Sequence, residues 1–215
     1  MNLNEWQPFY SQIAREFGFD RAQDERSAQI LSDLLAQKTG YHSTLTKLNR
    51  LINRCDVLVC GKAPILIRDI KSGKIEGRET IIAADGSTSV LLAQGVIPHI
   101  VVSDLDGSIT DLKRANALCA IMVVHAHGDN VNAIETYVPS LSAVLGTTQT
   151  QPEPLLLNVG GFTDGDRAVS LAKEYDAHTI STIGFDFSDK SVTQRKMKKL
   201  QWAKRLLEQA EVNFK

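Results

Sequence analysis

Apolar residues recur at two different spacings along this chain, and the spacing changes near residue 54. Before that point they return every three or four positions, which is the period of an amphipathic α-helix. The pattern predicts three helices and no strand. Their apolar residues are Trp6, Phe9, Tyr10, Ile13 and Phe17 in the first, Ile30, Leu31, Leu34 and Leu35 in the second, which Asp24 is expected to cap, and Leu45, Leu48, Leu51 and Ile52 in the third.

Beyond Cys55 the apolar residues gather instead in short runs of strand length. The runs do not alternate with polar residues, which is typical of strands buried on both faces of a parallel sheet. Amphipathic stretches separate most of them, so we expect an α/β fold with a mainly parallel, Rossmann-like sheet and helices on both faces. Strands are expected at 57–60, 80–83, 100–102, 121–124, 155–157 and 179–183, and helices at 86–94, 110–119, 129–138, 165–175 and 191–211.

The two patterns suggest a helical N-terminal segment over residues 1–54 and an α/β catalytic domain over residues 55–215. A chain of 215 residues, 43% hydrophobic and 23% charged, is long enough for one such domain with a full core. Its net charge of −1 argues against a nucleic-acid partner. No apolar run approaches the roughly 18 residues of a membrane helix, and no signal peptide is recognisable, so we expect a cytoplasmic protein without a membrane partner.

Two further groups of residues are predicted to play no part in the chemistry. The cysteines form no CxxC pair, so they are expected to be reduced and buried. The last helix is strongly basic on one side, which is interpreted as a solvated face and not as a binding patch. These residues are Cys55, Cys60 and Cys119, and Lys196, Lys198, Lys199, Lys204 and Arg205.

Acidic residues follow most of the predicted strands. In an open parallel sheet, ligands bind beyond the carboxyl ends of the strands, so these acids should share one edge. A single aspartate after a strand is most simply a helix cap. Many carboxylates at one edge repel one another unless cations offset them, which favours a divalent-metal site. The acids are Asp85, Asp104, Asp106, Asp129, Asp164, Asp166 and Asp186.

The pair Asp104-x-Asp106 is the sharpest of these signals. A turn at Asp-Leu-Asp-Gly can direct both carboxylates to one cation, and oxygen ligands suit a hard cation such as Mg²⁺. The pair His125-x-His127 suggests zinc only weakly, because no cysteine lies near it in the sequence. His125 is expected to end a strand as a packed residue, whereas His127 and Asp129 lie in the loop, where they can meet substrate or metal.

A glycine-rich turn, Gly160-Gly161-Phe162-Thr163-Asp164-Gly165, precedes a predicted helix. Backbone N–H groups at such a turn can cradle phosphate, although glycine turns also serve as plain connections. The chain has neither a GxxxxGK[ST] P-loop nor a GxGxxG fingerprint, so the commonest modes of ATP and NAD binding are excluded.

Taken in order, these motifs resemble the archaeal 6-hydroxymethyl-dihydropterin pyrophosphokinase family and, more distantly, thiamine pyrophosphokinase. The resemblance runs from about Asp56 to Asp186. It implies a thiamine-pyrophosphokinase-like fold, Mg²⁺ as cofactor, and ATP and a reduced hydroxymethyl pterin as substrates. The motifs are Ala84-Asp85-Gly86, Ser103-Asp104-Leu105-Asp106-Gly107, His125-Ala126-His127-Gly128-Asp129-Asn130, Gly146-Thr147-Thr148-Gln149 and Gly160-Gly161-Phe162-Thr163-Asp164-Gly165-Asp166-Arg167.

The same resemblance implies roles for single residues. Asp104, Asp106 and Asp129 would be the metal ligands and catalytic acids, and His127 or one aspartate would accept the proton of the substrate hydroxyl. Arg167 would grip phosphate, although a helix-stabilising arginine is an equal alternative. The expected substrate and ATP contacts are Asp85, Gly86, Asn130, Thr148, Gln149, Gly160, Gly161, Asp164, Asp166 and Arg167.

Three other functions stay open at this point. The acids would also serve a thiamine pyrophosphokinase-like enzyme or a metal-dependent nucleotide phosphohydrolase. A non-catalytic nucleotide-binding module is a further alternative, but binding alone seldom needs so many carboxylates. The resemblance also leaves the assembly open, with a homodimer as one option.

Overall fold

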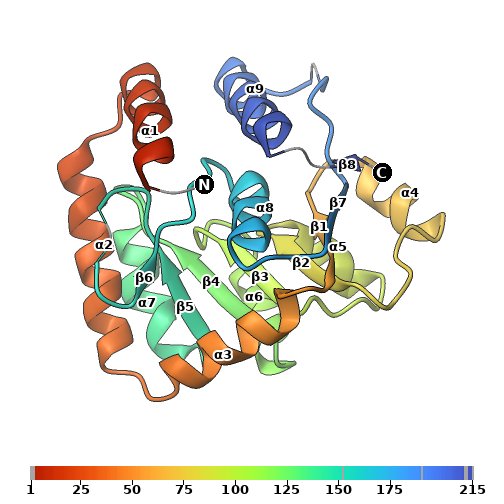
Figure 1. Cartoon of the computed structure of the whole chain (residues 1–215), viewed down its shortest axis with the longest axis horizontal. Coiled ribbons are helices and arrows are strands. Elements are labelled where there is room, and N and C mark those ends of the chain that lie inside the picture. The colour runs from red at the N-terminus through yellow and green to blue at the C-terminus, as the bar shows by residue number, and fades with distance from the viewer. Residues whose placement is uncertain (1–2, 152, 190, 211–212, 215) are drawn as a thin grey trace.

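A computed structural model describes residues 3–151, 153–189 and 191–210, together with the backbone of residues 213 and 214. One sheet runs through the molecule with helices on both of its faces (Figure 1). Its eight described strands follow the order β6-β5-β4-β3-β2-β1-β7-β8, and each neighbouring pair is parallel. The predicted α/β class is confirmed.

Strands and helices alternate along most of the chain, as the apolar runs predict. The strands are β1 (Asp56–Cys60), β2 (Thr80–Ala84), β3 (Ile100–Ser103), β4 (Ile121–His125), β5 (Val144–Thr147), β6 (Leu156–Leu157), β7 (Thr179–Ile183) and β8 (Asn213–Phe214). The helices are α1 (Leu3–Phe17), α2 (Arg21–Ala36), α3 (Tyr41–Ile52), α4 (Ile65–Lys71), α5 (Ser87–Ala93), α6 (Ile109–Ala117), α7 (Val131–Tyr137), α8 (Asp164–Glu174) and α9 (Gln194–Gln209), with a short 3₁₀ helix at Val138–Ser140. Residue 211, the end of the last predicted helix, lies outside the described residues.

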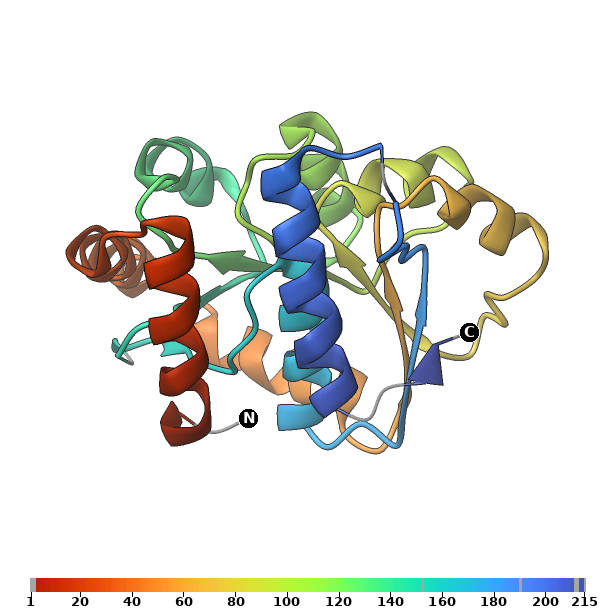
Figure 2. The same ribbon diagram turned by 90° about the horizontal axis from the view of Figure 1, so that it is seen from above.

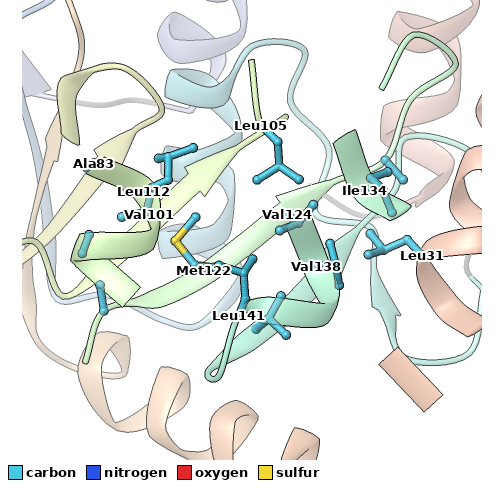
Figure 3. Packing of buried hydrophobic residues seen from close by; sticks show 14 of the residues in the cluster. Leu31, Ala83, Val101, Leu105, Leu112, Met122, Val124, Ile134, Val138 and Leu141 are labelled. Atoms are coloured by element: carbon cyan, nitrogen blue, oxygen red, sulfur yellow. The ribbon is translucent and has the colours of Figure 1, made fainter. Parts of the chain in front are cut away.

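Two apolar clusters fill the space between the sheet and its helices. On one face α2, α4, α5, α6 and α7 pack against the strands. Figure 3 shows part of this cluster, in which Leu112 of α6 and Ile134 of α7 lie with Val101, Met122 and Val124 of the sheet. On the opposite face α3, α8 and the end of α9 cover the strands. Burial on both faces explains why the strands read as continuous apolar runs.

The N-terminal helices share this core. α2 contributes Leu31 and Leu35 to the first cluster, and α3 contributes Leu48 and Ile52 to the second. α1 packs on the C-terminal helix α9, and the two lie side by side in Figures 1 and 2. A division into folding units at residue 54 stays a prediction. The buried residues of this third cluster are Trp6, Tyr10, Ile13 and Leu206.

Strands β5 and β8 and helix α4 were not among the predicted elements, and one predicted helix cap is misplaced. β5 is short, contains Gly146 and leads into a polar run, so it carries no clear strand signal. α2 begins earlier than expected, at Arg21, and its cap is Asp20, whose carboxylate accepts a hydrogen bond of 2.9 Å from the N–H of Ala22. The expectation that Asp24 caps this helix is therefore wrong.

Two smaller expectations also need correction. Of the three free cysteines only Cys60 is buried, whereas Cys55 is half-buried and Cys119 is exposed. On α9, Lys196 and Lys199 face a cavity and not bulk solvent alone. In the part of the chain that the structure describes, we find no helix with the length and apolar character needed to span a bilayer.

Candidate active site

A cavity of about 640 Å³ opens at the carboxyl edge of the sheet. The loops after β1, β2, β3 and β4 contribute to it, together with the turn between α1 and α2, the start of α8, the loop after β7 and one side of α9. Segments from both ends of the chain therefore meet at this edge. Of the residues expected at the site, those that line the cavity are Asp85, Gly86, Asp104, Asp106, His127, Asp129, Gln149 and Asp164.

Three carboxylates lie together in this cavity. One oxygen from each of Asp85, Asp104 and Asp106 lies within 4.8 Å of the other two. Leu105 has a left-handed φ of 68°, and it turns the chain between the two aspartates that flank it. The N–H of Asp106 donates to Asp104 Oδ1 at 3.2 Å, and Ser103 Oγ donates to Asp85 Oδ1 at 2.6 Å. The turn predicted at Asp-Leu-Asp-Gly does bring both carboxylates to one place.

The carboxylates of this group repel one another. Burial, Asp104 and Asp85 together raise the pKa of Asp106 to about 6. Burial also acts to raise the pKa of Asp104, but the hydrogen bond from His127 and the electrostatic attraction of its ring outweigh that effect and lower it. A Cβ added at Gly107 would lie 2.5 Å from Asp85 Oδ2, so only glycine leaves this carboxylate its space. An all-carboxylate group of this kind suits a hard divalent cation.

The buried side chain of Asn130 holds the loop after β4. Its Oδ1 accepts from the N–H of His127 at 3.0 Å, and its Nδ2 donates to the carbonyls of Asp104 and His125 at 2.8 and 2.7 Å. The imidazole of His127 then faces the acids. Its Nδ1 accepts from the N–H of Asp129 at 3.3 Å, which leaves the proton on Nε2 to donate to Asp104 Oδ2 at 3.4 Å.

His125 ends β4 as a packed residue, as expected, with 4% of its surface exposed. Its Nε2 accepts from Arg167 at 3.0 Å, and its Nδ1 lies 3.2 Å from Thr147 Oγ1. Burial and the positive charge of Arg167 hold the pKa of this imidazole well below its usual value, so it stays neutral. Arg167 is itself only 1% exposed and also donates to the carbonyl of Gly160 at 3.3 Å. The guanidinium of Arg167 therefore binds groups of the protein interior.

Two aspartates in the first turn of α8 face in different directions. Asp164 lines the cavity, where its own burial and the charges of Asp104 and Asp85 raise its pKa well above the usual value. Asp166 turns back into the protein and accepts a hydrogen bond of 2.9 Å from the N–H of Thr163, completing a capping box. The geometry thus gives Asp166 a capping contact and leaves Asp164 at the site.

A buried carboxylate from the N-terminal helices also reaches this edge. Asp24 is 3% exposed, and its Oδ2 accepts from Tyr10 Oη at 2.8 Å and from Gln149 Nε2 at 2.7 Å. Its Oδ1 accepts from the N–H of Gly128 at 2.7 Å. Asp24 therefore joins α1, α2 and the segment after β5 to the loop that carries His127.

Residues 34–192, which make up most of the chain, match the family described as 6-hydroxymethylpterin diphosphokinase MptE-like. The chain belongs to this family. The resemblance inferred from the acidic and glycine-rich motifs is confirmed.

Three archaeal relatives of this MptE-like chain are each named 6-hydroxymethyl-7,8-dihydropterin pyrophosphokinase. The protein of Pyrococcus furiosus is 43% identical over 97% of this chain and 94% of its own length. That of Methanothermobacter thermautotrophicus is 41% identical over 88% of this chain and 80% of its own length. That of Methanocaldococcus jannaschii is 38% identical, with coverages of 87% and 80%. The similarity therefore extends over nearly the whole chain.

In this member of the MptE-like family, the remaining residues expected at the site lie beneath the cavity and not on its surface. Thr148, for example, is buried, and its hydroxyl lies 3.0 Å from that of Thr150. These residues fix the loops that carry the lining residues. They are Asn130, Thr148, Gly160, Gly161, Asp166 and Arg167.

Several residues that line the cavity were not among the predicted site residues. Phe17 and Asp24 were assigned only to helical patterns, because an acid or an aromatic residue at helical spacing gives no sign of which cavity it borders, and Phe19 was not singled out at all. Lys62 follows β1 in the loop where ligands are expected, so its position was a usable signal.

Proposed function

We propose that this chain transfers the β,γ-diphosphoryl group of ATP to the hydroxymethyl group of 6-hydroxymethyl-7,8-dihydropterin, with Mg²⁺ as cofactor and AMP as the second product. The reaction would belong to the synthesis of tetrahydromethanopterin or a folate-type cofactor. The names of the three relatives support the acceptor and the reaction type. The observation on this chain that carries the proposal is the carboxylate group of Asp85, Asp104 and Asp106 in a 640 Å³ cavity.

The carboxylate group fits a magnesium ion. Its donors are all oxygens, and they lie within 4.8 Å of one another. A triphosphate brought to this group would meet strong repulsion, because unit charges about 4 Å apart interact by roughly 1–4 kcal/mol in partly solvated surroundings. Asp85, Asp104 and Asp106 would hold the ion, and Asp129 lines the same cavity as a further candidate ligand. Bound there, Mg²⁺ would supply positive charge to the phosphate oxygens.

In the proposed reaction the diphosphoryl group passes directly between the two substrates, and the protein forms no covalent bond to either. The hydroxymethyl oxygen of the pterin forms a bond to the β-phosphorus of ATP, and the bond from that phosphorus to the oxygen bridging the α-phosphate breaks, so that AMP leaves. Positioning and charge neutralisation supply most of the rate in such a transfer. The loops at the edge of the sheet keep the reacting groups in place. Lys62 lines the cavity and brings a positive charge for phosphate.

The proton of the substrate hydroxyl passes most simply to an aspartate. Both nitrogens of His127 are engaged, one with the N–H of Asp129 and the other with Asp104. We therefore propose that His127 orients Asp104 and does not act as the base. This choice decides between the two acceptors that the motifs leave open.

The test is analysis of nucleotides and pterins after incubation with ATP, Mg²⁺ and 6-hydroxymethyl-7,8-dihydropterin. AMP and the pterin diphosphate should form in equal amounts, EDTA should stop the reaction, and added Mg²⁺ should restore it. ADP with a pterin monophosphate would contradict attack at the β-phosphorus. AMP formed equally well without any pterin would point to a phosphohydrolase instead. Turnover of thiamine in place of the pterin would move the acceptor to the thiamine class.

A further inference from the structure

The carboxylates follow β2 and β3, which lie between β1 and β7 on one side and β4 and β5 on the other, so the single cavity has a half on each side of them. One half lies at the ends of β1 and β7 and is lined by Gly61, Lys62 and Phe185. The other half lies toward the ends of β4 and β5 and is lined by the turn that joins α1 and α2. We call α1 and α2, residues 3–36, the N-terminal hairpin. Two substrates react over the carboxylates, so each half is available to one of them.

The half at β1 and β7 has the features of a nucleotide site. The strand order reverses there, since β2 to β6 extend the sheet on one side of β1 and β7 adds to the other side. Ligands of open α/β sheets bind in the crevice at such a switch point. The chain comes close to itself in this crevice, because a Cβ added at Gly61 would lie 2.6 Å from the carbonyl oxygen of Gly184. Lys62 projects over Gly86 beside it, with its Nζ 2.6 Å from where a Cβ of that glycine would stand.

The half at the N-terminal hairpin has an aromatic wall, which we define as Phe17, Phe19 and Phe162. The rings of Phe17 and Phe19 stack with centroids 5.7 Å apart and planes 15° apart. Phe162 lies 5.1 Å from the first ring and 6.1 Å from the second. All three are half-buried and line the cavity. Gly18, at a φ of 70°, turns the chain so that Phe17 and Phe19 come to lie together.

The aromatic wall is held next to the carboxylates by polar contacts. Asp24 accepts the N–H of Gly128, and a Cβ added to that glycine would lie only 2.8 Å from Cβ of Gln23. The start of α2 thus packs directly on the loop of His127, whose ring contacts Asp104. A ring bound against the wall would therefore lie close to the reacting phosphate.

We infer that the aromatic wall binds the flat fused ring of the hydroxymethyl acceptor, while the nucleotide occupies the half at β1 and β7. This assignment rests on the proposed function, which requires one planar acceptor and one nucleotide. Aromatic faces attract planar heterocycles by stacking, and removing such a partner costs about 1–3 kcal/mol per ring. The nucleotide half has its own stacked pair, Phe185 and Phe187, with centroids 5.8 Å apart. Each planar ring thus has aromatic neighbours of its own, on opposite sides of the carboxylates.

The inference is tested by measuring dissociation constants for each substrate separately. The variants are Phe17→Leu and Phe162→Leu in the aromatic wall and Phe187→Leu in the other half. Leucine keeps most of the apolar volume and removes the ring face, so the fold should survive, as circular dichroism and thermal unfolding can verify. The matched control is Phe9→Leu, because Phe9 lies on the same helix and packs in the same cluster without lining the cavity.

Titration calorimetry with Mg²⁺ would use 6-hydroxymethyl-7,8-dihydropterin and a non-hydrolysable ATP analogue as ligands. The wall variants should weaken pterin binding about tenfold and change binding of the ATP analogue less than about twofold. Phe187→Leu should do the reverse, and Phe9→Leu should change neither constant. Wall variants that weaken the ATP analogue and spare the pterin, or that change neither constant, would overturn the inference.

Failure of the proposed function looks different in the same experiment. Wild-type protein that binds the pterin without turning it over would refute the pyrophosphokinase proposal and leave the wall open to the same binding test. Wild-type protein that binds no pterin at all would overturn both proposals together. Normal turnover with unchanged pterin affinity in the wall variants would overturn the wall alone.

Discussion

Two regions of the cavity come from different parts of the chain and differ in how they are built. The carboxylates follow strands β2 and β3, so each is placed by the strand directly before it. The N-terminal hairpin lies far from them in the sequence and is joined to the site by buried polar contacts, among them those of Asp24 with Gly128 and of Ser27 with Asn130. The positions of the carboxylates therefore follow from the local sequence, whereas the position of the hairpin depends on contacts between distant parts of the chain.

The largest expected effect concerns the carboxylates. Asp104→Asn and Asp106→Asn should each lower kcat by about 10²–10³-fold, because each removes charge from the group that would hold the cation. Thermal unfolding should show that the fold persists. Asp186→Asn is the matched control, since Asp186 lines the same cavity but its carboxylate already accepts from Ser188 at 2.9 and 2.7 Å.

The same series decides which acid completes the metal site. Asp85 lies with Asp104 and Asp106, whereas Asp129 is exposed and outside that group. Asp85→Asn should therefore raise the Mg²⁺ concentration needed for half-maximal rate more than Asp129→Asn does. A larger effect of Asp129→Asn would show that Asp129 is a metal ligand, as the family resemblance implies, and that Asp85 is not.

The second effect, smaller than the first, concerns the link between the two regions. Asp24→Asn should lower kcat roughly 10- to 100-fold, the range for partners that orient functional groups, although Asp24 contacts neither Asp104 nor Asp106. The reason is that the amide cannot accept all three hydrogen bonds from Tyr10, Gln149 and Gly128.

The matched control for this link is Asp33→Asn, because Asp33 lies on the same helix but is exposed, and it accepts a hydrogen bond from Gln29 of that helix. A purely structural role for Asp24 would lower the unfolding temperature and leave kcat of the folded fraction unchanged. That result would show that the contacts of Asp24 contribute to folding and not to catalysis.

Much of the carboxylate region could be predicted from the sequence. Apolar runs locate the strands, parallel neighbours bring their carboxyl ends together, and the Asp-Leu-Asp-Gly turn lies between two such ends. The hairpin could not be placed in the same way. The hydrogen bond from Gly128 to Asp24 spans 104 positions, and an acid near the expected start of a helix is most simply a cap.

The residues that fix the loops were also hard to predict. Arg167 and Asn130 are polar and lie in the motifs, so both were predicted as candidate ligands, with a helix-stabilising role as an equal alternative for Arg167. Their buried side chains contact backbone carbonyls and, for Arg167, His125. Which side of a loop faces the cavity depends on side-chain packing, and that information is absent from a motif.

The smallest expected effect comes from a single hydroxyl in the N-terminal hairpin. Tyr10→Phe removes the donor to Asp24 Oδ2 and keeps the ring, while Gln149 and Gly128 continue to donate. A hydrogen bond to a charged group contributes about 1.5–3 kcal/mol, so the free energy of unfolding should fall by roughly that amount and the melting temperature by several degrees. We expect kcat to fall only two- to fivefold, since the His127 loop keeps its contact with Asp24, a factor that corresponds to about 0.4–1 kcal/mol.

Burial and Asp24 raise the pKa of the Tyr10 phenol above its usual 10.0. The stabilisation by this group is therefore fully present at neutral pH and is lost only as the pH rises from about 10 towards the folded-state pKa. Unfolding measured from pH 7 upwards should therefore show a constant difference between wild type and variant until alkaline pH. A difference that grows or disappears between pH 6 and 8 would show that another group governs this contact.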